Sequence, residues 1–407
     1  MNLNQRIQYN LVCAAIVGLL AIQPTWANET TDWNEIAMSA MRKPAWPLLR
    51  RERALAMTQI AVYEAANAIE HRYESSSLAV SAEAGASLPA AINEAAYEVL
   101  VDQIPEDATN LKTEHDRRLA AIAEGAAKVA GVLVGMNAAR LVLDWRRHDG
   151  ADWSSAYQPG SGPGAYQPTS EDPVDEPLIS RMKPFAMTAA SEFRPGPPPA
   201  LESGEYQRAL EEVKSLGDLR STIRTPDQTE EGLFFRTPGI WPWNEIARKA
   251  IVAHKLDELD SAHALALLDT ALMDAHLAAW DTKYTYNAWR PVTAIRAGGP
   301  GAKPDPDWMP LIPTPMHPEY PCAHCLLGSA AKTILQGLFG KERFSFDVQN
   351  NGFTRHFNSF EEFAVQESNA RVYAGVHFRF SLEAGELTGG KVAEFVLTRA
   401  SKPLAAK

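Results

Sequence analysis

The sequence is poor in cysteine and has no surplus of basic residues. Only three of its 407 residues are cysteines, and one of them, Cys13, lies near the N-terminus. Lys and Arg number 39 against 50 Asp and Glu, a formal net charge of −11. Affinity for nucleic acid comes mainly from clustered cations that neutralise phosphates, so this balance argues against a nucleic-acid partner. A site that binds an anion would have to be a local cluster of positive charge in a chain that is negatively charged as a whole.

Long apolar runs are also scarce. Arg6, the apolar run Leu11 to Ile22 and the small residues ending at Ala27 predict a cleaved secretory signal over residues 1–27. Twelve apolar residues are too few to cross a hydrocarbon core of about 30 Å. No later stretch reads as long and apolar enough to span a bilayer. We therefore expect a mature chain without a membrane span, periplasmic or secreted, and compatible with a homo-oligomer.

A convincing β-alternating pattern, heptads and short repeats are all missing, whereas Ala/Leu-rich helical segments recur along the chain. Arg51 to Ile69 has apolar residues among many alanines and no proline, which is typical of a closely packed helix. Further helices are predicted over 31–39, 90–100, 116–143, 205–216, 244–254, 260–286, 324–337, 360–376 and 383–399. The fold class predicted is all-α, a helical bundle of two packed helical halves.

Between the two halves the composition changes. Residues 151–204 are rich in Pro and Gly and have no period, so they form an irregular excursion of about fifty residues. Trp153, Tyr157, Tyr166 and Phe193 favour packing of this segment against the body. The predicted organisation is an N-terminal helical half at 28–150, the connecting segment, and a C-terminal half at 205–407 that carries the site and forms one integrated domain with the first.

Two cations lie seven residues apart near the end of the helix predicted over 260–286. Two helical turns separate Lys283 from Arg290, so both can project from one face before Pro291 ends the helix. Two cations aimed at one point repel each other unless an anion lies between them. A solvated basic face is the alternative for this segment taken alone.

A helix start follows at Cys322-Ala323-His324, after the Pro-rich approach His317 to Pro321. Free backbone N–H groups at such a start bind anions. A histidine in the first turn is well placed to exchange protons with a bound oxyanion, although it could simply cap or pack.

Arg371 and His377 flank Gly375. Six residues of unbroken helix would set the two side chains roughly 120° apart. We expect the helix to end or bend near the glycine, so that His377 points back towards Arg371.

The order and spacing of these segments resemble the vanadium-dependent haloperoxidase and type 2 phosphatidic acid phosphatase superfamily. Its marks are Lys-x6-Arg-Pro, Pro-Ser-Gly-His and Ser-Arg-x5-His. Here they read Lys283-x6-Arg290-Pro291, Pro321-Cys322-Ala323-His324 and Ala370-Arg371-x5-His377. The segments RERALAMTQIAVYEAANAI, HPEYP and YAGVHFRFS look like the bacterial haloperoxidase-like branch.

The resemblance implies a role for each matched residue. His377 would bind vanadium through a ring nitrogen, or attack phosphorus in a phosphatase, and His324 would be the general acid and base. The oxyanion would be bound by Lys283, Arg290, Arg371, Cys322 and Ala323. Several fixed cations and a proton-exchanging group are what such an anion needs. Trp289 and His317 are candidates for a halide pocket, with packing as the alternative.

The implied cofactor is vanadate, with phosphate as a competing ligand. The small-molecule substrates would be hydrogen peroxide, a halide and an organic acceptor, or else a phosphomonoester. Three hypotheses remain open: a vanadate-dependent haloperoxidase, an acid phosphatase on the same site, and a catalytically weakened oxyanion-binding homologue.

The sequence departs from the superfamily pattern beside the proposed general acid. Cys322 and Ala323 replace Ser-Gly, and Ala370 replaces a serine. A thiol is a weaker hydrogen-bond donor than a hydroxyl, so one contact to the oxyanion is weakened or lost. Cys322 and Cys325 could form a local disulfide or remain thiols. Zinc binding and a thioredoxin-like role are weaker alternatives, because neither the ligand number nor a βαβ pattern supports them.

Overall fold

The computed structural model describes residues 28–42, 47–151, 157–237, 239–298, 302–341, 343–400 and 402–404. The predicted signal at residues 1–27 and the side chain of Trp153 lie outside these ranges. The first part of the chain contains α1 (Glu29–Arg42), α2 (Leu48–Glu70), α3 (Leu88–Gln103), η1 (Pro105–Asp107), α4 (Ala108–Ala120), α5 (Ala126–Arg146) and η2 (Ile179–Arg181). The second part contains α6 (Gly204–Leu216), α7 (Pro226–Phe234), α8 (Ile240–His254), α9 (Glu258–Tyr286), α10 (Pro291–Ala297), α11 (Ala323–Phe339), β1 (Phe346–Asn350), β2 (Phe353–Phe357), α12 (Phe360–Tyr373) and α13 (Arg379–Arg399).

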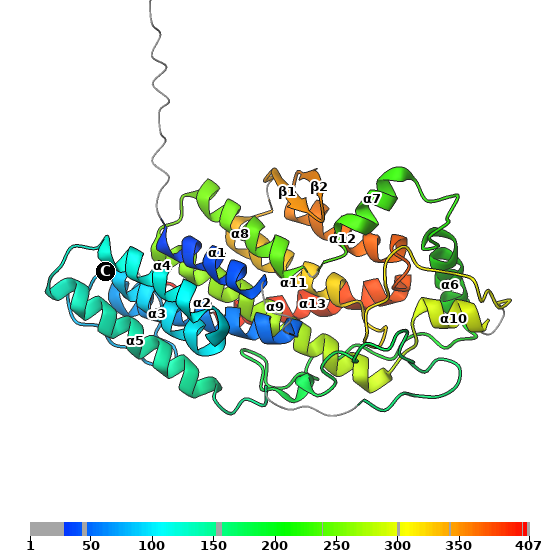
Figure 1. Cartoon of the computed structure of the whole chain (residues 1–407), viewed down its shortest axis with the longest axis horizontal. Helices are drawn as coiled ribbons and strands as arrows, with labels where there is room; N and C mark the ends of the chain where they lie inside the picture. Colours follow the sequence, from blue (N-terminus) through cyan, green and yellow to red (C-terminus); the bar gives the residue numbers. More distant parts are fainter. Residues whose placement is uncertain are drawn as a thin grey trace, which may run out of the picture.

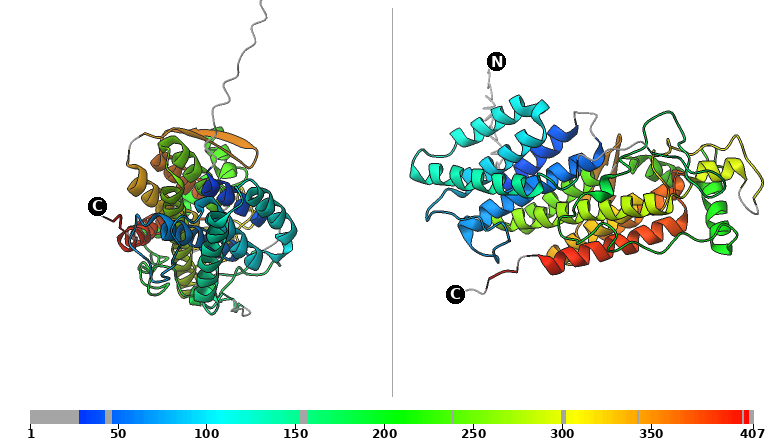
Figure 2. Two further views of the ribbon diagram at one scale, coloured as in Figure 1. Left: turned by 90° about the vertical axis from the view of Figure 1, so that its left-hand side faces the viewer. Right: turned by 90° about the horizontal axis from the view of Figure 1, so that it is seen from below.

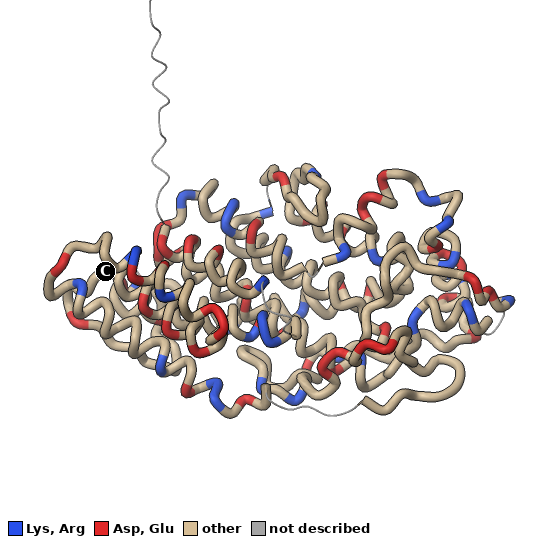
Figure 3. Tube along the Cα trace, viewed as in Figure 1, with Lys and Arg blue, Asp and Glu red and all other residues tan. Residues whose placement is uncertain are grey.

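The described residues form an elongated helical bundle, which confirms the predicted all-α class. Helices α1 to α5 gather at one end and α6 and α10 at the other (Figure 1), and the long helices run roughly along the long axis in the turned views as well (Figure 2). Acidic and basic residues are interspersed along the trace, without one dominant basic face (Figure 3).

Helix α9 joins the two parts of the bundle. It is 29 residues long and packs against α2, α11 and α13. Ala262 and Ala266 belong to the apolar cluster around α2, α3 and α5, while Leu265 and Leu268 belong to the cluster around α11 and α13. Residues on all faces of α9 are buried, as expected for a helix that is apolar all round.

The helix predicted over 116–143 is two helices. Helix α4 ends at Ala120 and α5 begins at Ala126, after Gly125 at φ 149°. Glycine adopts this backbone region without a Cβ penalty, so the chain can reverse here.

Among the described helices, α5 alone has the length and apolar composition of a membrane span. The expectation that no later stretch would pass that test was therefore wrong.

One β-hairpin was missed by the search for alternating residues. Strands β1 and β2 pair antiparallel, with Asn350 opposite Phe353. Asn351 and Gly352 connect them, both with positive φ, as a type I′ turn requires. The Asn-Gly pair is the sequence signal for this turn. The two strands have only five residues each, so their alternation of buried and exposed residues is too short to identify them.

The irregular excursion packs on the bundle, as its aromatic residues predicted. The Tyr157 hydroxyl donates to Asn287 Oδ1 at 2.5 Å, and the Tyr166 side chain is fully buried. The ring of Phe193 meets Phe395 of α13 edge-on at 5.4 Å. The excursion therefore covers the end of α9 and the loop that follows it.

Helices α11 and α13 approach each other closely enough to require glycine. A Cβ on Gly389 would lie 2.0 Å from the Leu326 carbonyl oxygen, whereas a Cβ on neighbouring Gly390 would lie 3.6 Å from Ser329 Oγ. This close contact holds the start of α11 against α13.

We expect Gly389→Ala to lower the free energy of unfolding by about 1–3 kcal/mol, because the added methyl group meets backbone that cannot move aside cheaply. Gly390→Ala is the matched control, since the same helix propensity gain of up to about 1 kcal/mol applies there without the clash. Urea unfolding followed by circular dichroism measures both. Equal stabilities for the two variants would contradict this packing.

Candidate active site

The predicted cations converge from three segments. Lys283 lies in the last turn of α9, and Arg371 lies in the last turn of α12. Arg290 is not on α9, contrary to the expectation that it would share a helix face with Lys283. Helix α9 ends at Tyr286, and Arg290 is the N-cap of α10. Asn287 in the left-handed conformation ends α9 before Pro291 could do so.

All three cations are buried. Lys283 and Arg290 are 0% exposed and Arg371 is 1% exposed. Among the described residues, no carboxylate oxygen lies within ion-pair distance of any of them. Isolated buried charges are costly, so three unpaired cations in one region favour binding of an anion.

The Lys283 ammonium is held by main-chain carbonyls. Its Nζ donates to the carbonyl oxygens of Pro318, Glu319 and Pro321, at 2.9, 2.8 and 2.5 Å. An ammonium has three N–H donors, so all of them have acceptors here. Lys283 thus fixes the loop that leads to His324 and supplies charge to the site.

The Arg290 guanidinium joins two other parts of the site. Its Nε donates to the His317 carbonyl at 2.9 Å and its Nη1 donates to the Val376 carbonyl at 2.9 Å. Nη1 also lies 3.2 Å from His377 Nε2, and Nη2 lies 3.0 Å from His317 Nδ1. Arg290 therefore orients both histidines.

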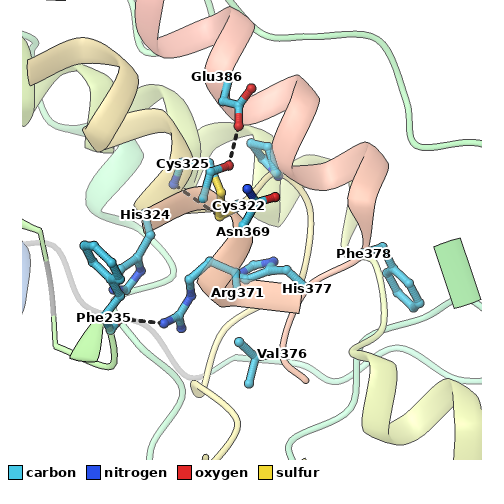
Figure 4. The surroundings of a disulfide bond; sticks show 12 residues. Phe235, Cys322, His324, Cys325, Asn369, Arg371, Val376, His377, Phe378 and Glu386 are labelled. Carbon is cyan, nitrogen blue, oxygen red and sulfur yellow. Dashed lines mark hydrogen bonds between the residues drawn. A yellow bond between two sulfur atoms is a disulfide. The ribbon is translucent and has the colours of Figure 1, made fainter. Parts of the chain in front are cut away.

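Arg371 keeps unused donors. Its Nη1 donates to the Phe235 carbonyl at 2.8 Å, and its buried Nε has no hydrogen-bond partner. Figure 4 shows Arg371 beside His377, with His324 on the same side of the neighbouring disulfide. An unpaired buried guanidinium N–H is the donor most readily available to an oxyanion.

The expected bend near Gly375 is present and places His377 back beside Arg371. Helix α12 ends at Tyr373, and Gly375 has φ 77°. A Cβ at Gly375 would lie 2.5 Å from the Gly217 carbonyl oxygen, so both the conformation and the space require glycine.

Glu319 fixes the tautomer of His377. Its Oε1 lies 2.8 Å from His377 Nδ1 and accepts a second bond from the Phe378 amide at 3.1 Å. Arginine can only donate, so His377 Nε2 is an acceptor and its Nδ1 carries the proton. His377 therefore presents a lone pair on Nε2, the form needed by a metal ligand or nucleophile.

The shared burial of these groups changes their pKa values. Burial lowers the pKa of Lys283 well below its usual value and lowers the pKa of Arg371 to about 9, with neighbouring Arg290 adding to both effects. Burial, reinforced by Arg290 and Lys283, lowers the pKa of His377 well below its usual value. A bound dianion would oppose each of these shifts.

His324 occupies the first turn of α11, as predicted. Its Nε2 lies 3.0 Å from the Thr237 carbonyl oxygen, which can only accept, so Nε2 carries the proton and Nδ1 is free to act as a base. Burial lowers the pKa of His324 well below its usual value, and the charge of Arg371 lowers it further. His324 is therefore neutral at neutral pH with its Nδ1 lone pair available, and a bound anion would raise its pKa and favour proton uptake.

Cys322 and Cys325 form a disulfide, with an S–S distance of 2.09 Å. Cys322 Sγ accepts a bond from the Cys325 amide at 3.2 Å, so the disulfide sulfur caps α11. It has no S–H to donate, and the donor that a serine would supply is therefore absent.

The described residues contain no group of three His, Cys, Asp or Glu suited to a metal ion.

The two halide-pocket candidates lie in different surroundings. The Trp289 indole N–H donates to the Tyr206 hydroxyl at 2.8 Å within an apolar cluster. His317 contacts Arg290 directly, and its ring centroid lies 4.8 Å from that of Trp280. The geometry brings His317 to the cations and gives Trp289 a packing role.

Sequence reasoning missed two carboxylates. Glu319 belongs to the HPEYP segment, where an acidic residue two positions before Pro321 was the available signal. Glu367 lies one helical turn before Arg371 and is 1% exposed. Its Oε2 accepts from the Trp243 indole at 2.8 Å, and its Oε1 has no partner. Burial raises the pKa of Glu367 to about 8.

We expect Glu367→Gln to stabilise the protein increasingly as pH rises from about 4.5 to about 8. A carboxyl whose folded pKa is raised stabilises the fold below its unfolded pKa, and this contribution is lost as pH rises through the folded value. The upper limit is about 1.4 kcal/mol per pH unit. Urea unfolding at four pH values measures the difference, with exposed Glu361→Gln on the same helix as control. A gain that does not vary with pH would contradict the raised pKa.

Comparisons with known proteins point to one family. Residues 263–406 match the family model described as VCPO second helical-bundle domain. The vanadium chloroperoxidase of Curvularia inaequalis is 26% identical over 275 residues, which cover 50% of this chain and 45% of the relative. The match thus spans less than half of the fungal protein's length.

Two solved structures have the same fold. The crystal structure of a bacterial vanadium-dependent iodoperoxidase superposes with a TM-score of 0.82 at 23% identity. The match covers 93% of this chain and 97% of the other. An apo-type bacterial vanadium-dependent chloroperoxidase gives 0.69 at 18% identity, covering 86% and 94%. These two structures show that the chain shares the fold of vanadium-dependent haloperoxidases, and the family-model match over residues 263–406 supports its resemblance to that superfamily.

Proposed function

We propose that this protein is a vanadate-dependent haloperoxidase-like enzyme that oxidises halide with hydrogen peroxide. The observation that carries the proposal is the burial of Lys283, Arg290 and Arg371 without a carboxylate in ion-pair contact. An anion bound among these cations would offset their mutual repulsion, and vanadate offers several oxygens for charge-assisted hydrogen bonds.

The residues present fit vanadate. Arg371 has an unpaired buried N–H, and His377 presents Nε2 rather than Nδ1 towards Arg290. In this proposal Nε2 binds the oxyanion in place of its hydrogen bond from Arg290. Bound vanadate would supply a Lewis-acid centre that polarises the peroxide oxygens.

Glu319 acts through His377 and is a positioning residue. The carboxylate at 2.8 Å holds the Nδ1 proton and increases the basicity of Nε2. Its second bond, to the Phe378 amide, fixes the carboxylate in turn.

His324 would accept and donate protons at the bound oxyanion. Its free Nδ1 can accept a proton from incoming hydrogen peroxide, and the imidazolium can return a proton to the departing oxygen. The Thr237 carbonyl keeps Nε2 protonated and the ring in one orientation.

An acid phosphatase on the same site is the second candidate. Phosphate has the same shape and charge as vanadate, and a lone pair on His377 Nε2 is equally suited to attack phosphorus. The disulfide has no S–H donor, so one contact to the oxyanion is lost. A catalytically weakened oxyanion-binding homologue is therefore the third candidate. The predicted leader would place either enzyme in the periplasm or outside the cell.

A paired assay separates these functions. Purified protein is tested with vanadate, hydrogen peroxide and bromide or iodide for dye halogenation, and without vanadate for p-nitrophenyl phosphate hydrolysis. We expect halogenation that His377→Ala reduces at least about a thousandfold, because the Nε2 lone pair that would bind the oxyanion is removed. Phosphate release alone would identify the phosphatase, and neither activity with retained vanadate binding would identify the weakened homologue.

Removal of Arg371 tests the cation cluster independently of turnover. We expect Arg371→Ala to weaken vanadate and phosphate binding about 10- to 100-fold, as for loss of a charge-assisted bond of about 1.5–3 kcal/mol. Arg379→Ala is the control, because Arg379 pairs with Glu212 on the partly exposed side of α13. Isothermal titration calorimetry measures both variants. Equal affinities would remove Arg371 from the oxyanion site.

A further inference from the structure

A second pair of buried titratable groups lies on the same face of α9 as Lys283. His276 precedes Lys283 by two helical turns, and its Nδ1 lies 2.5 Å from Glu52 Oε2 on α2. Each of the two side chains is 1% exposed. The oxyanion site described above does not use this pair.

Both members of the pair have an unused polar atom. His276 Nε2 and Glu52 Oε1 are buried and have no hydrogen-bond partner. Buried polar atoms without a partner are costly, and ordered water usually satisfies them. These two atoms are therefore available to bind water and to exchange a proton.

Side-chain contacts continue from the pair to the oxyanion site. The ring centroids of His276 and Trp280 lie 4.3 Å apart, and those of Trp280 and His317 lie 4.8 Å apart. His317 then contacts Arg290 at 3.0 Å. The distance from the pair to the cations is thus bridged by two side chains.

The connecting segment leads from the pair towards solvent. Glu176 is half-buried and interacts electrostatically with both Glu52 and His276, and burial raises its pKa to about 7. Burial raises the pKa of neighbouring Asp175 to about 6, and its main-chain carbonyl accepts from the Trp280 indole at 3.3 Å. The other titratable groups that interact with the pair are Asp269 of α9, His317 and His324.

Halide oxidation needs such a proton source. In the balanced reaction, hydrogen peroxide, a halide ion and one proton give hypohalous acid and water. The halide loses two electrons, the O–O bond breaks, and one proton is consumed in each turnover. Resting on the proposed function, we propose that the Glu52–His276 pair takes up this proton through Glu176 and supplies it by way of water and His317 to the oxyanion site.

Calorimetry of phosphate binding tests the pair without relying on activity. Titrations in two buffers of different ionisation enthalpy give the number of protons taken up with the anion. We expect uptake to fall by at least half in Glu52→Gln and to stay at the wild-type value in Glu94→Gln. Glu94 forms a matched buried pair with His115 at 2.8 Å, on α3 and α4.

Turnover provides the second readout. We expect Glu52→Gln to lower halide oxidation at pH 7 at least tenfold, with a vanadate Kd within twofold of wild type. Glu176→Gln should lower turnover about three- to tenfold and leave the number of protons taken up unchanged, because it removes only the group through which the proton enters.

The outcomes separate this proposal from the function on which it rests. Wild-type proton uptake in Glu52→Gln, or turnover equal to that of Glu94→Gln, would overturn the proton pair. Oxyanion binding without halide oxidation in the wild type would overturn the proposed function, and the uptake number would still decide whether the pair holds the proton. If the wild type binds neither phosphate nor vanadate, both proposals fail.

Discussion

The repulsion among three buried cations is the constraint on which the rest of the site depends. Lys283 donates to three carbonyl oxygens and to no carboxylate, and Arg371 keeps an unpaired Nε. The nearby carboxylates Glu319 and Glu367 act on the cations electrostatically but bond to other groups, Glu319 to His377 and a backbone amide, and Glu367 to Trp243. Backbone carbonyls of the segments that precede α11 and that follow α7 and α12 hold the three cations in place. The site therefore presents fixed positive charge that a bound anion would balance.

Long helices and close backbone contacts make this arrangement rigid. Helix α9 carries His276, Trp280 and Lys283 on one buried face, which connects the N-terminal helices to the oxyanion site. Gly389 lets α13 approach α11 until backbone meets backbone, so the first turn of α11, with its disulfide cap and His324, cannot shift freely. The excursion covers the end of α9 and adds Glu176 to the same polar region.

Much of this could be predicted from the sequence, because local patterns decide it. Apolar periodicity located the main helices, motif spacing selected Lys283, Arg371 and His377, and Gly375 indicated the bend that brings the last two together. Features set by tertiary contact could not be predicted. The placement of Arg290 on α10 rather than on α9 depends on Asn287 in the left-handed region, and the choice between a Cys322–Cys325 disulfide and free thiols and the pairing of Glu319 with His377 depend on folded distances.

A crystal structure of the protein with vanadate tests the central claim most directly. We expect vanadium within bonding distance of His377 Nε2, with an oxygen accepting from Arg371 Nε. Vanadate bound elsewhere, or bound here with His377 still hydrogen-bonded to Arg290 and Arg371 Nε still unpaired, would contradict it.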